Sequence, residues 1–169
     1  MADKDQNQEH DDLSPEERRK RFWDRLEGIN AGMLGLAEDM RLVPMSHTAD
    51  REAHALWFIT AKGQHLVDGV EGGPKKALHV IADAGGKLYA RIEGQLELVH
   101  DEAKLDELWN PVADSWFDQG RKDPDVRLLK LPVAAAEVWT TSGGLNFILQ
   151  IAKSKLTGAD PDMGEHFTV

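Results

Sequence analysis

Two short stretches of the chain carry side chains that could hold a ligand. They are RLVPMS at residues 41–46 and LWFIT at residues 56–60. Proline in the first stretch removes a donor from the backbone ladder, so we expect an edge strand or a bulge there, with backbone groups left free. A planar amphiphilic ring could lie against two such strands, with Arg41, Ser46 and Thr60 donating to a phosphate or a ribityl chain. The competing interpretation is that these are ordinary edge-strand residues.

The other candidates for chemistry are weaker. GGPKK at residues 72–76 combines backbone N–H groups with lysine charge, although a solvated turn is the simpler interpretation. The seven histidines form no HExxH or HxH pattern, so we predict no metal site and expect His47, His54 and His79 to be structural. The chain has no cysteine, which excludes disulfides and thiolate nucleophiles. It also has no GxSxG, Walker or GxGxxG motif, so any catalysis would depend on other groups or on a cofactor.

Length and charge narrow the classes of function. A chain of 169 residues suits one domain. Its net charge of −10 repels polyanions, so we expect neither nucleic acid nor a membrane surface as a partner. Residues 1–13 are polar and charged without an apolar run, which predicts a disordered acidic tail rather than a signal peptide or an anchor, and a cytoplasmic protein.

The hydrophobic pattern predicts a mainly β domain over residues 14–157. A capping box at Ser14-Pro15-Glu16-Glu17 opens one helix, and Asp101 caps a second whose inner face includes Trp109. Helical spacing returns over 145–156. Strands are predicted over residues 33–37, 42–45, 55–59, 77–82, 88–99, 126–131 and 135–140, with one or two helical turns at 64–70 and a loose tail at 158–169. Crossover helices are missing between most strands, which favours a compact antiparallel barrel with flanking short helices.

Several segments, in order along the chain, resemble one known family. They are RLVPMS at 41–46, LWFIT at 56–60, LYARIEGQLELV at 88–99, LWNP at 108–111, SWFDQG at 115–120, DPDVRLLKL at 123–131 and AEVW at 136–139. Through them the chain resembles, over about residues 15–157, the FMN-binding split-barrel superfamily that includes the pyridoxamine 5'-phosphate oxidases. The resemblance is closer to the bacterial general stress protein branch of that superfamily.

The resemblance implies a Greek-key split barrel that forms a homodimer, with two flavin sites at the subunit interface. The implied cofactor is FMN, with FAD as the open alternative. The residues that the resemblance assigns to one subunit's share of the site are Arg41, Pro44, Met45, Ser46, Phe58, Ile59, Thr60, Gln64 and His65. Tyr89 falls where the oxidases have a polar contact to the ring, and Trp116 and Trp139 would approach from the neighbouring chain.

The sequence departs from the family pattern in two places. Relatives carry a Ser-x-Lys phosphate grip six residues past the Thr, where this chain has Gln64-His65-Leu66. We expect Lys62, His65 or Lys75 to compensate, and a weak or unusual flavin preference to result. The Arg-x-His stretch that orients the oxidase substrate is also missing from residues 140–147, so we expect no pyridoxamine 5'-phosphate oxidase activity.

Three functions remain open from the sequence. The first is a flavin-binding general stress protein of the stress response that stores, senses or buffers flavin. The second is a flavin oxidoreductase that takes hydride from a reduced nicotinamide and passes electrons to an unknown acceptor. The third is a degenerate barrel without cofactor that serves as an interaction module. Whether the protein is an enzyme, and which residues would be catalytic, stays open.

Overall fold

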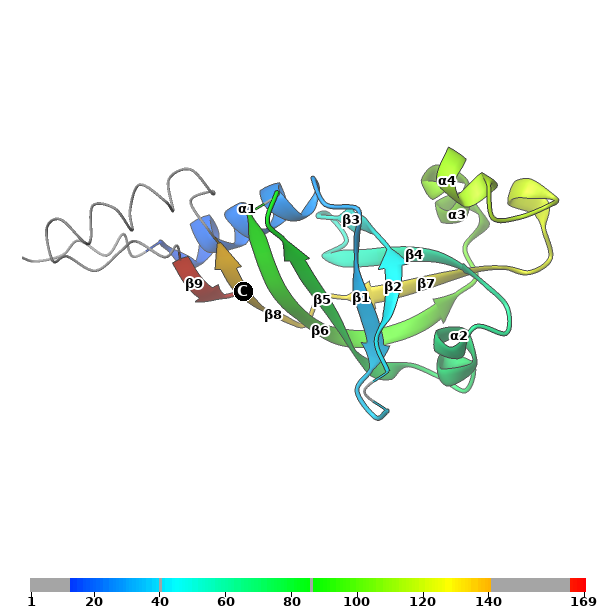
Figure 1. Cartoon of the computed structure of the whole chain (residues 1–169), viewed down its shortest axis with the longest axis horizontal. Helices are drawn as coiled ribbons and strands as arrows, with labels where there is room; N and C mark the ends of the chain where they lie inside the picture. Colours follow the sequence, from blue (N-terminus) through cyan, green and yellow to red (C-terminus); the bar gives the residue numbers. More distant parts are fainter. Residues whose placement is uncertain (1–12, 40, 86, 141–164) are drawn as a thin grey trace, which may run out of the picture.

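The described strands form one antiparallel sheet that curls into a half-barrel. The computed structural model describes residues 13–39, 41–85, 87–140 and 165–169 (Figure 1). The strands are β1 (Ala31–Leu36), β2 (Val43–Ser46), β3 (Thr48–Asp50), β4 (Ala55–Ala61), β5 (Lys75–Asp83), β6 (Leu88–Val99), β7 (Val126–Pro132), β8 (Ala135–Thr140) and β9 (Glu165–Thr168). The helices are α1 (Pro15–Leu26), α2 (His65–Val70), α3 (Glu102–Leu108), α4 (Pro111–Asp114) and the short 3-10 helix η1 (Gly120–Lys122). The prediction of a mainly β, antiparallel barrel with short helices is therefore confirmed, in its split form.

The long strand β6 joins the two halves of the sheet. The strand order is β2-β1-β5-β6-β7-β4-β3, with β8 beside β6 and β9 beside β8. One edge of β6 pairs with β5, whereas the other pairs with β8 over residues 88–93 and with β7 over residues 97–99. The partner changes next to Gly94, where a Cβ would lie 2.0 Å from the Pro132 carbonyl oxygen. Glycine is needed there because the chain between β7 and β8 passes directly over the backbone.

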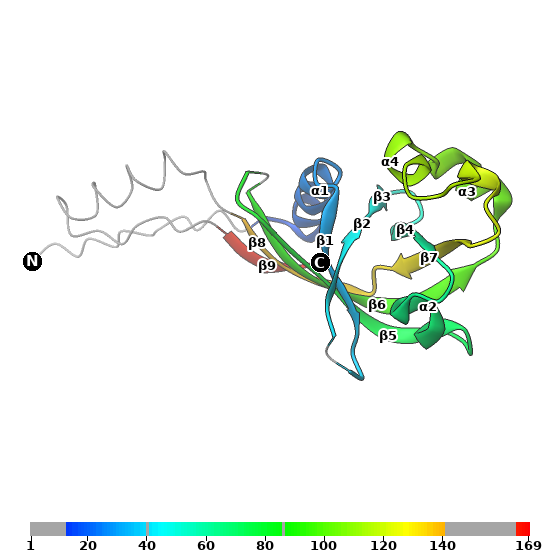
Figure 2. The ribbon, with the colours of Figure 1, turned by 45° about the vertical axis from the view of Figure 1, so that its right-hand side comes forward.

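The barrel stays open between β2 and β4. The edge of β2 that faces away from β1 has no strand partner in the part of the chain that the structure describes. Strand β3 pairs with β4 only over residues 55–57, so residues 58–61 also have one edge without a neighbouring strand among the described residues. The two strands approach each other, as the two views in Figures 1 and 2 show. We call this pair of facing free edges the split.

Helix α1 begins where the sequence predicts it. The Ser14 hydroxyl accepts a hydrogen bond from the Glu17 N–H at 3.3 Å, and the Ser14 N–H donates to the Glu17 carboxylate at 2.8 Å. These two bonds form the capping box that fixes the first turn. Phe22 and Leu26 on the inner face of the helix are fully buried and belong to the main core of the barrel. Burial of each such side chain contributes about 2 kcal/mol, so α1 is held mainly by its apolar face.

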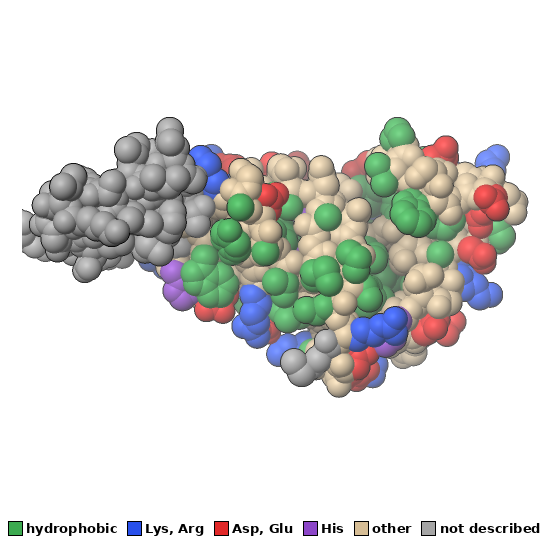
Figure 3. Space-filling view, in the orientation of Figure 1, with side chains coloured by type: hydrophobic (Ala, Val, Ile, Leu, Met, Phe, Trp, Pro, Cys, Tyr) green, Lys and Arg blue, Asp and Glu red, His purple; other side chains and the backbone are tan. Residues whose placement is uncertain are grey.

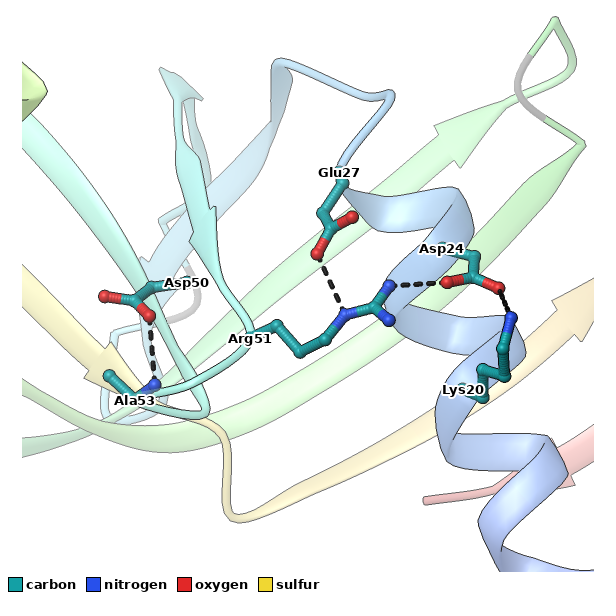
Figure 4. Close-up of polar contacts among 6 residues, drawn as sticks. All are labelled: Lys20, Asp24, Glu27, Asp50, Arg51 and Ala53. Carbon is teal, nitrogen blue, oxygen red and sulfur yellow. Dashed lines mark hydrogen bonds and ion pairs between the residues drawn. The ribbon is translucent and has the colours of Figure 1, made fainter.

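Arg51 ties α1 to the turn between β3 and β4. Its Nη2 lies 2.6 Å from Asp24 and its Nε lies 2.9 Å from Glu27 (Figure 4). The turn itself is fixed by the Ala53 N–H, which donates to Asp50 at 2.9 Å. All of these groups are partly exposed, so the ion pairs orient the helix more than they stabilise it.

Three local predictions differ from the structure. Strand β3 was not predicted, because its three residues are too few to show an alternating pattern. Helix α3 ends at Leu108, so Trp109 lies outside it; the Asn110 side chain caps the next helix instead. The prediction of a loose tail is wrong for residues 165–168. These residues form β9 against β8 and bury Phe167 in the core. A free strand edge in β8 recruits this segment, which no local pattern reveals.

Some predictions fall on residues outside the described ranges. These are the acidic tail up to residue 12 and the helix predicted over 145–156. Within the described residues, none of the helices has the length and apolar character needed to cross a membrane.

Candidate functional site

The strand register sorts the side chains onto two faces of the sheet. One row of successive partners runs across five strands through Pro44, Met33, Val80, Arg91 and Glu137. Directly paired residues point to the same side of a sheet, so these five side chains share one face, which we call the outer face. The alternate residues of the same strands point to the other side and supply much of the main core.

The outer face is apolar over a large part of its area. Four large side chains are exposed there: Met33 at 39%, Leu42 at 40%, Tyr89 at 36% and Trp139 at 38%. Leu42 reaches this face over Gly35, whose Cβ would lie 2.8 Å from the leucine Cδ2. Figure 3 shows hydrophobic side chains gathered over the middle strands of this view. These apolar side chains share the face with charged ones such as Arg91 and Glu137.

The residues predicted from β2 and β4 lie along the split. Strand β2 and the segment before it carry three exposed residues of the prediction, Arg41, Pro44 and Ser46. Met45 of the same strand packs against the core. The guanidinium of Arg41 makes no hydrogen bond or ion pair with another described residue, although its charge helps to lower the pKa of the nearby Asp39. The split therefore offers a cation without a direct ion-pair partner among the described residues, beside free backbone groups.

The predicted residues of β4 differ from one another in exposure. Phe58 is fully buried in the core, so only its backbone could face a ligand. Ile59 and Thr60 are half-buried. Ile59 packs against a second cluster, in which Trp57 and Leu108 hold α3 to the sheet. Thr60 alone of the three offers a side-chain hydroxyl that solvent can reach.

The segment that replaces the Ser-x-Lys grip begins helix α2. Gln64 is exposed and its side chain makes no capping bond. Leu66, at the lysine position, is only 3% exposed and belongs to the main core. His65 lies with its Nε2 2.5 Å from an Asp39 carboxylate oxygen. Of the three expected substitutes for the lysine, His65 is therefore already paired with an anion.

The other two expected substitutes differ from each other. Lys75 lies 3.5 Å from Glu38, a second carboxylate of the turn between β1 and β2. The side chain of Lys62 is exposed, while its backbone N–H donates to Asp125 at 2.7 Å. Of these two lysines, Lys62 is the one whose ammonium group has no ion-pair partner among the described residues.

The other three aromatic residues of the prediction lie in two separate parts of the molecule (Figure 1). Tyr89 and Trp139 are direct partners on β6 and β8, and the Trp139 ring stacks on His166 with centroids 4.9 Å apart. Trp116 follows α4 and is 80% exposed. Figure 1 shows α4 and β8 at opposite ends of the molecule. One chain therefore does not bring Trp116 together with the other two.

Two histidines are buried behind the split. The ring nitrogens His79 Nε2 and His47 Nδ1 lie 3.1 Å apart, and the Phe58 ring packs against both residues. Burial lowers the pKa of His47 to about 4, although backbone groups of Leu26 and Ile29 oppose the shift. Burial, together with the charge of His47, lowers the pKa of His79 to about 3. Both rings are thus neutral at physiological pH, which agrees with the structural role predicted for them.

Two cavities lie away from the predicted site. One, of about 400 Å³, lies between α3 and the segment before β7 and is lined by residues that include Leu105, Arg121 and Arg127. The other, of about 370 Å³, lies beside Arg51 and Lys104. No residue predicted to contact the cofactor lines either of them. The predicted site is thus an open surface in a single chain rather than an enclosed pocket.

Comparison with known proteins places the chain in a family. The model of the pyridoxamine 5'-phosphate oxidase like family matches residues 17–162. No curated protein matches the sequence.

Several solved structures share the fold. A protein assigned as general stress protein 26 of Jannaschia sp. CCS1 is 50% identical, with a TM-score of 0.82, over 90% of this chain and 97% of its own. The general stress FMN/FAD binding protein of Xanthomonas citri is 30% identical, with a TM-score of 0.68, over 76% and 92% of the two chains. General stress protein 26 of Bacillus anthracis, at 15% identity and a TM-score of 0.62, shares the fold alone. The chain is therefore a member of the pyridoxamine 5'-phosphate oxidase-like family, within its general stress protein branch.

Proposed function

We propose that this protein binds a flavin nucleotide at the split, as a homodimer with the flavin at the subunit interface. The cofactor is FMN, with FAD as the alternative. The observation that carries the proposal is the split itself, where two strands with free edges face each other beside the unpaired guanidinium of Arg41. A relative with 30% identity is described as an FMN/FAD binding protein, which supports the same cofactor here.

The apolar outer face supports the homodimer. Met33, Leu42 and Trp139 are exposed on one face of a sheet, where a second copy related by a two-fold axis would cover them. A second copy would also complete the open flavin surface and could bring Trp116 to a site that its own chain does not reach. Light scattering should give twice the mass of one chain. Met33→Lys should produce monomers, whereas Ala53→Lys, which adds the same charge to an exposed turn, should not.

Titration with FMN tests the cofactor. We expect saturable quenching of flavin fluorescence with one flavin per subunit. Arg41→Ala should weaken binding by about tenfold or more, since a charge-assisted bond to phosphate is lost. Arg19→Ala removes the same charge from the exposed side of α1 and should leave the affinity unchanged. Equal effects of the two variants would contradict the placement of the phosphate beside Arg41.

The titration and an assay with reduced nicotinamide together separate the remaining functions. A protein that binds no flavin would be an interaction module. Steady consumption of reduced nicotinamide by the loaded protein would identify a flavin oxidoreductase. A loaded protein that consumes none would fit a role in storing, sensing or buffering flavin.

A further inference from the structure

The turn between β1 and β2 places a carboxylate against the start of α2. Asp39 in this turn lies 2.5 Å from His65, at the start of α2. His65 stands within the segment that replaces the phosphate grip of the relatives. A carboxylate and a phosphate oxygen compete for the same donors, so the phosphate cannot use the Nε2 atom of His65 while Asp39 holds it.

Asp39 is held in this position by its own turn. Its second carboxylate oxygen accepts the Arg41 N–H at 2.9 Å, and its own N–H donates to the Leu36 carbonyl at 3.4 Å. The Arg41 N–H is the largest of the influences that lower the pKa of Asp39, followed by the bond to His65 and the nearby charges. The side chain is therefore an anion at neutral pH, fixed between the backbone of β2 and the first residue of α2.

The packing of α2 leaves little freedom for this contact to open. Leu66 is buried directly behind His65. A Cβ on Gly69 would lie 2.3 Å from Leu36, so the helix lies almost directly against β1, the strand that leads into the turn. Asp39 and His65 are thus attached to two elements that are packed together. The contact between Asp39 and His65 is therefore set by the packing of these two elements, although each side chain keeps 34% of its surface exposed.

We propose that Asp39 is a specificity-determining residue that cancels much of the contribution of the flavin phosphate, so that the site binds flavins with and without that phosphate at similar affinity. The proposal rests on the flavin binding proposed above. Arg41 attracts the phosphate, while Asp39, two residues earlier, repels it and occupies His65. Selection among flavins then depends mainly on contacts to the ring.

The test compares FMN with riboflavin, which differ only in the phosphate. For the wild-type protein we expect dissociation constants within about threefold of each other. Asp39→Asn keeps an acceptor for the Arg41 N–H and removes the charge, so it should tighten FMN binding by about fivefold to tenfold and leave riboflavin binding unchanged. Adding His65→Ala to Asp39→Asn should reverse most of this gain. Glu38→Gln, which removes the neighbouring charge of the same turn, should change neither affinity by more than about twofold.

Different outcomes overturn different statements. A wild-type preference for FMN of about a hundredfold, or an unchanged FMN to riboflavin ratio in Asp39→Asn, would overturn the role of Asp39 and leave flavin binding intact. Failure of the wild-type protein to bind either flavin would overturn the proposed function itself. The melting temperature of each variant is measured alongside. Asp39→Ser, which also retains a turn-forming acceptor, serves as the second variant if the asparagine destabilises the turn.

Discussion

The buried histidine pair should make the protein sensitive to mild acid. His47 and His79 ordinarily titrate at 6.5, and in the fold their pKa values fall to about 4 and about 3. Well above pH 6.5 these rings are neutral in both the folded and the unfolded chain, so the pair adds no pH dependence to stability there. Below 6.5 the unfolded chain takes up protons that the folded chain does not accept, which favours unfolding.

The size of the effect follows from the two shifts. For each ring, the free energy of unfolding falls by about 1.4 kcal/mol for every pH unit between the pKa of the unfolded chain and the pKa of the folded chain. At about pH 5 the loss is about 2 kcal/mol for each ring and about 4 kcal/mol for the pair. A domain of this size is stable by only about 5 to 15 kcal/mol, so the loss is a large part of the total.

Urea unfolding followed by tryptophan fluorescence measures this loss. Curves at about pH 8 and about pH 5, at one protein concentration, should differ in free energy of unfolding by about 4 kcal/mol. The carboxyls with lowered pKa, such as Asp24 and Asp50, do not interfere: their contribution is present above 3.8 and is lost only as the pH falls below that value. His79→Leu should halve the difference, whereas His100→Gln, at an exposed position, should preserve it. Equal stability of the wild-type protein at both pH values would refute the reasoning.

Two further predictions concern the fold. Gly94→Ala should destabilise the protein by about 2 kcal/mol or more in urea unfolding, because its Cβ would lie 2.0 Å from the Pro132 carbonyl oxygen, a backbone atom that cannot move cheaply. Gly72→Ala has open space around it and should leave stability within about 0.5 kcal/mol of wild type. Ser14→Ala should lower the melting temperature and cost about 1 kcal/mol, since the Glu17 N–H loses its acceptor; an unchanged melting temperature would show that the capping box contributes nothing.

Local patterns in the sequence were sufficient to predict most of the helices and strands. The Ser14 capping box, the Gly-bearing turn before β6 and the alternation along β6 each specify a structure within a few neighbouring residues. The proline at residue 44 correctly predicted a strand with a free edge, because a missing N–H is tolerated only where no neighbour needs it. Strand β9 could not be predicted in this way. Its four residues become a strand only because the edge of β8 is there to pair with them.

The sequence by itself determined the class of fold and the family. Its resemblance to that family also predicts a set of residues around a flavin and the replacement of the usual phosphate-site lysine by Leu66. Only the tertiary structure decided that Asp39 lies against His65, the neighbour of Leu66, since α2 packs on the strand β1 that leads into the turn of Asp39. It likewise decided that His47 and His79 share one buried contact. Both pairs join residues far apart along the chain. Such contacts depend on strand register and helix packing, which are set by the whole core rather than by neighbouring residues.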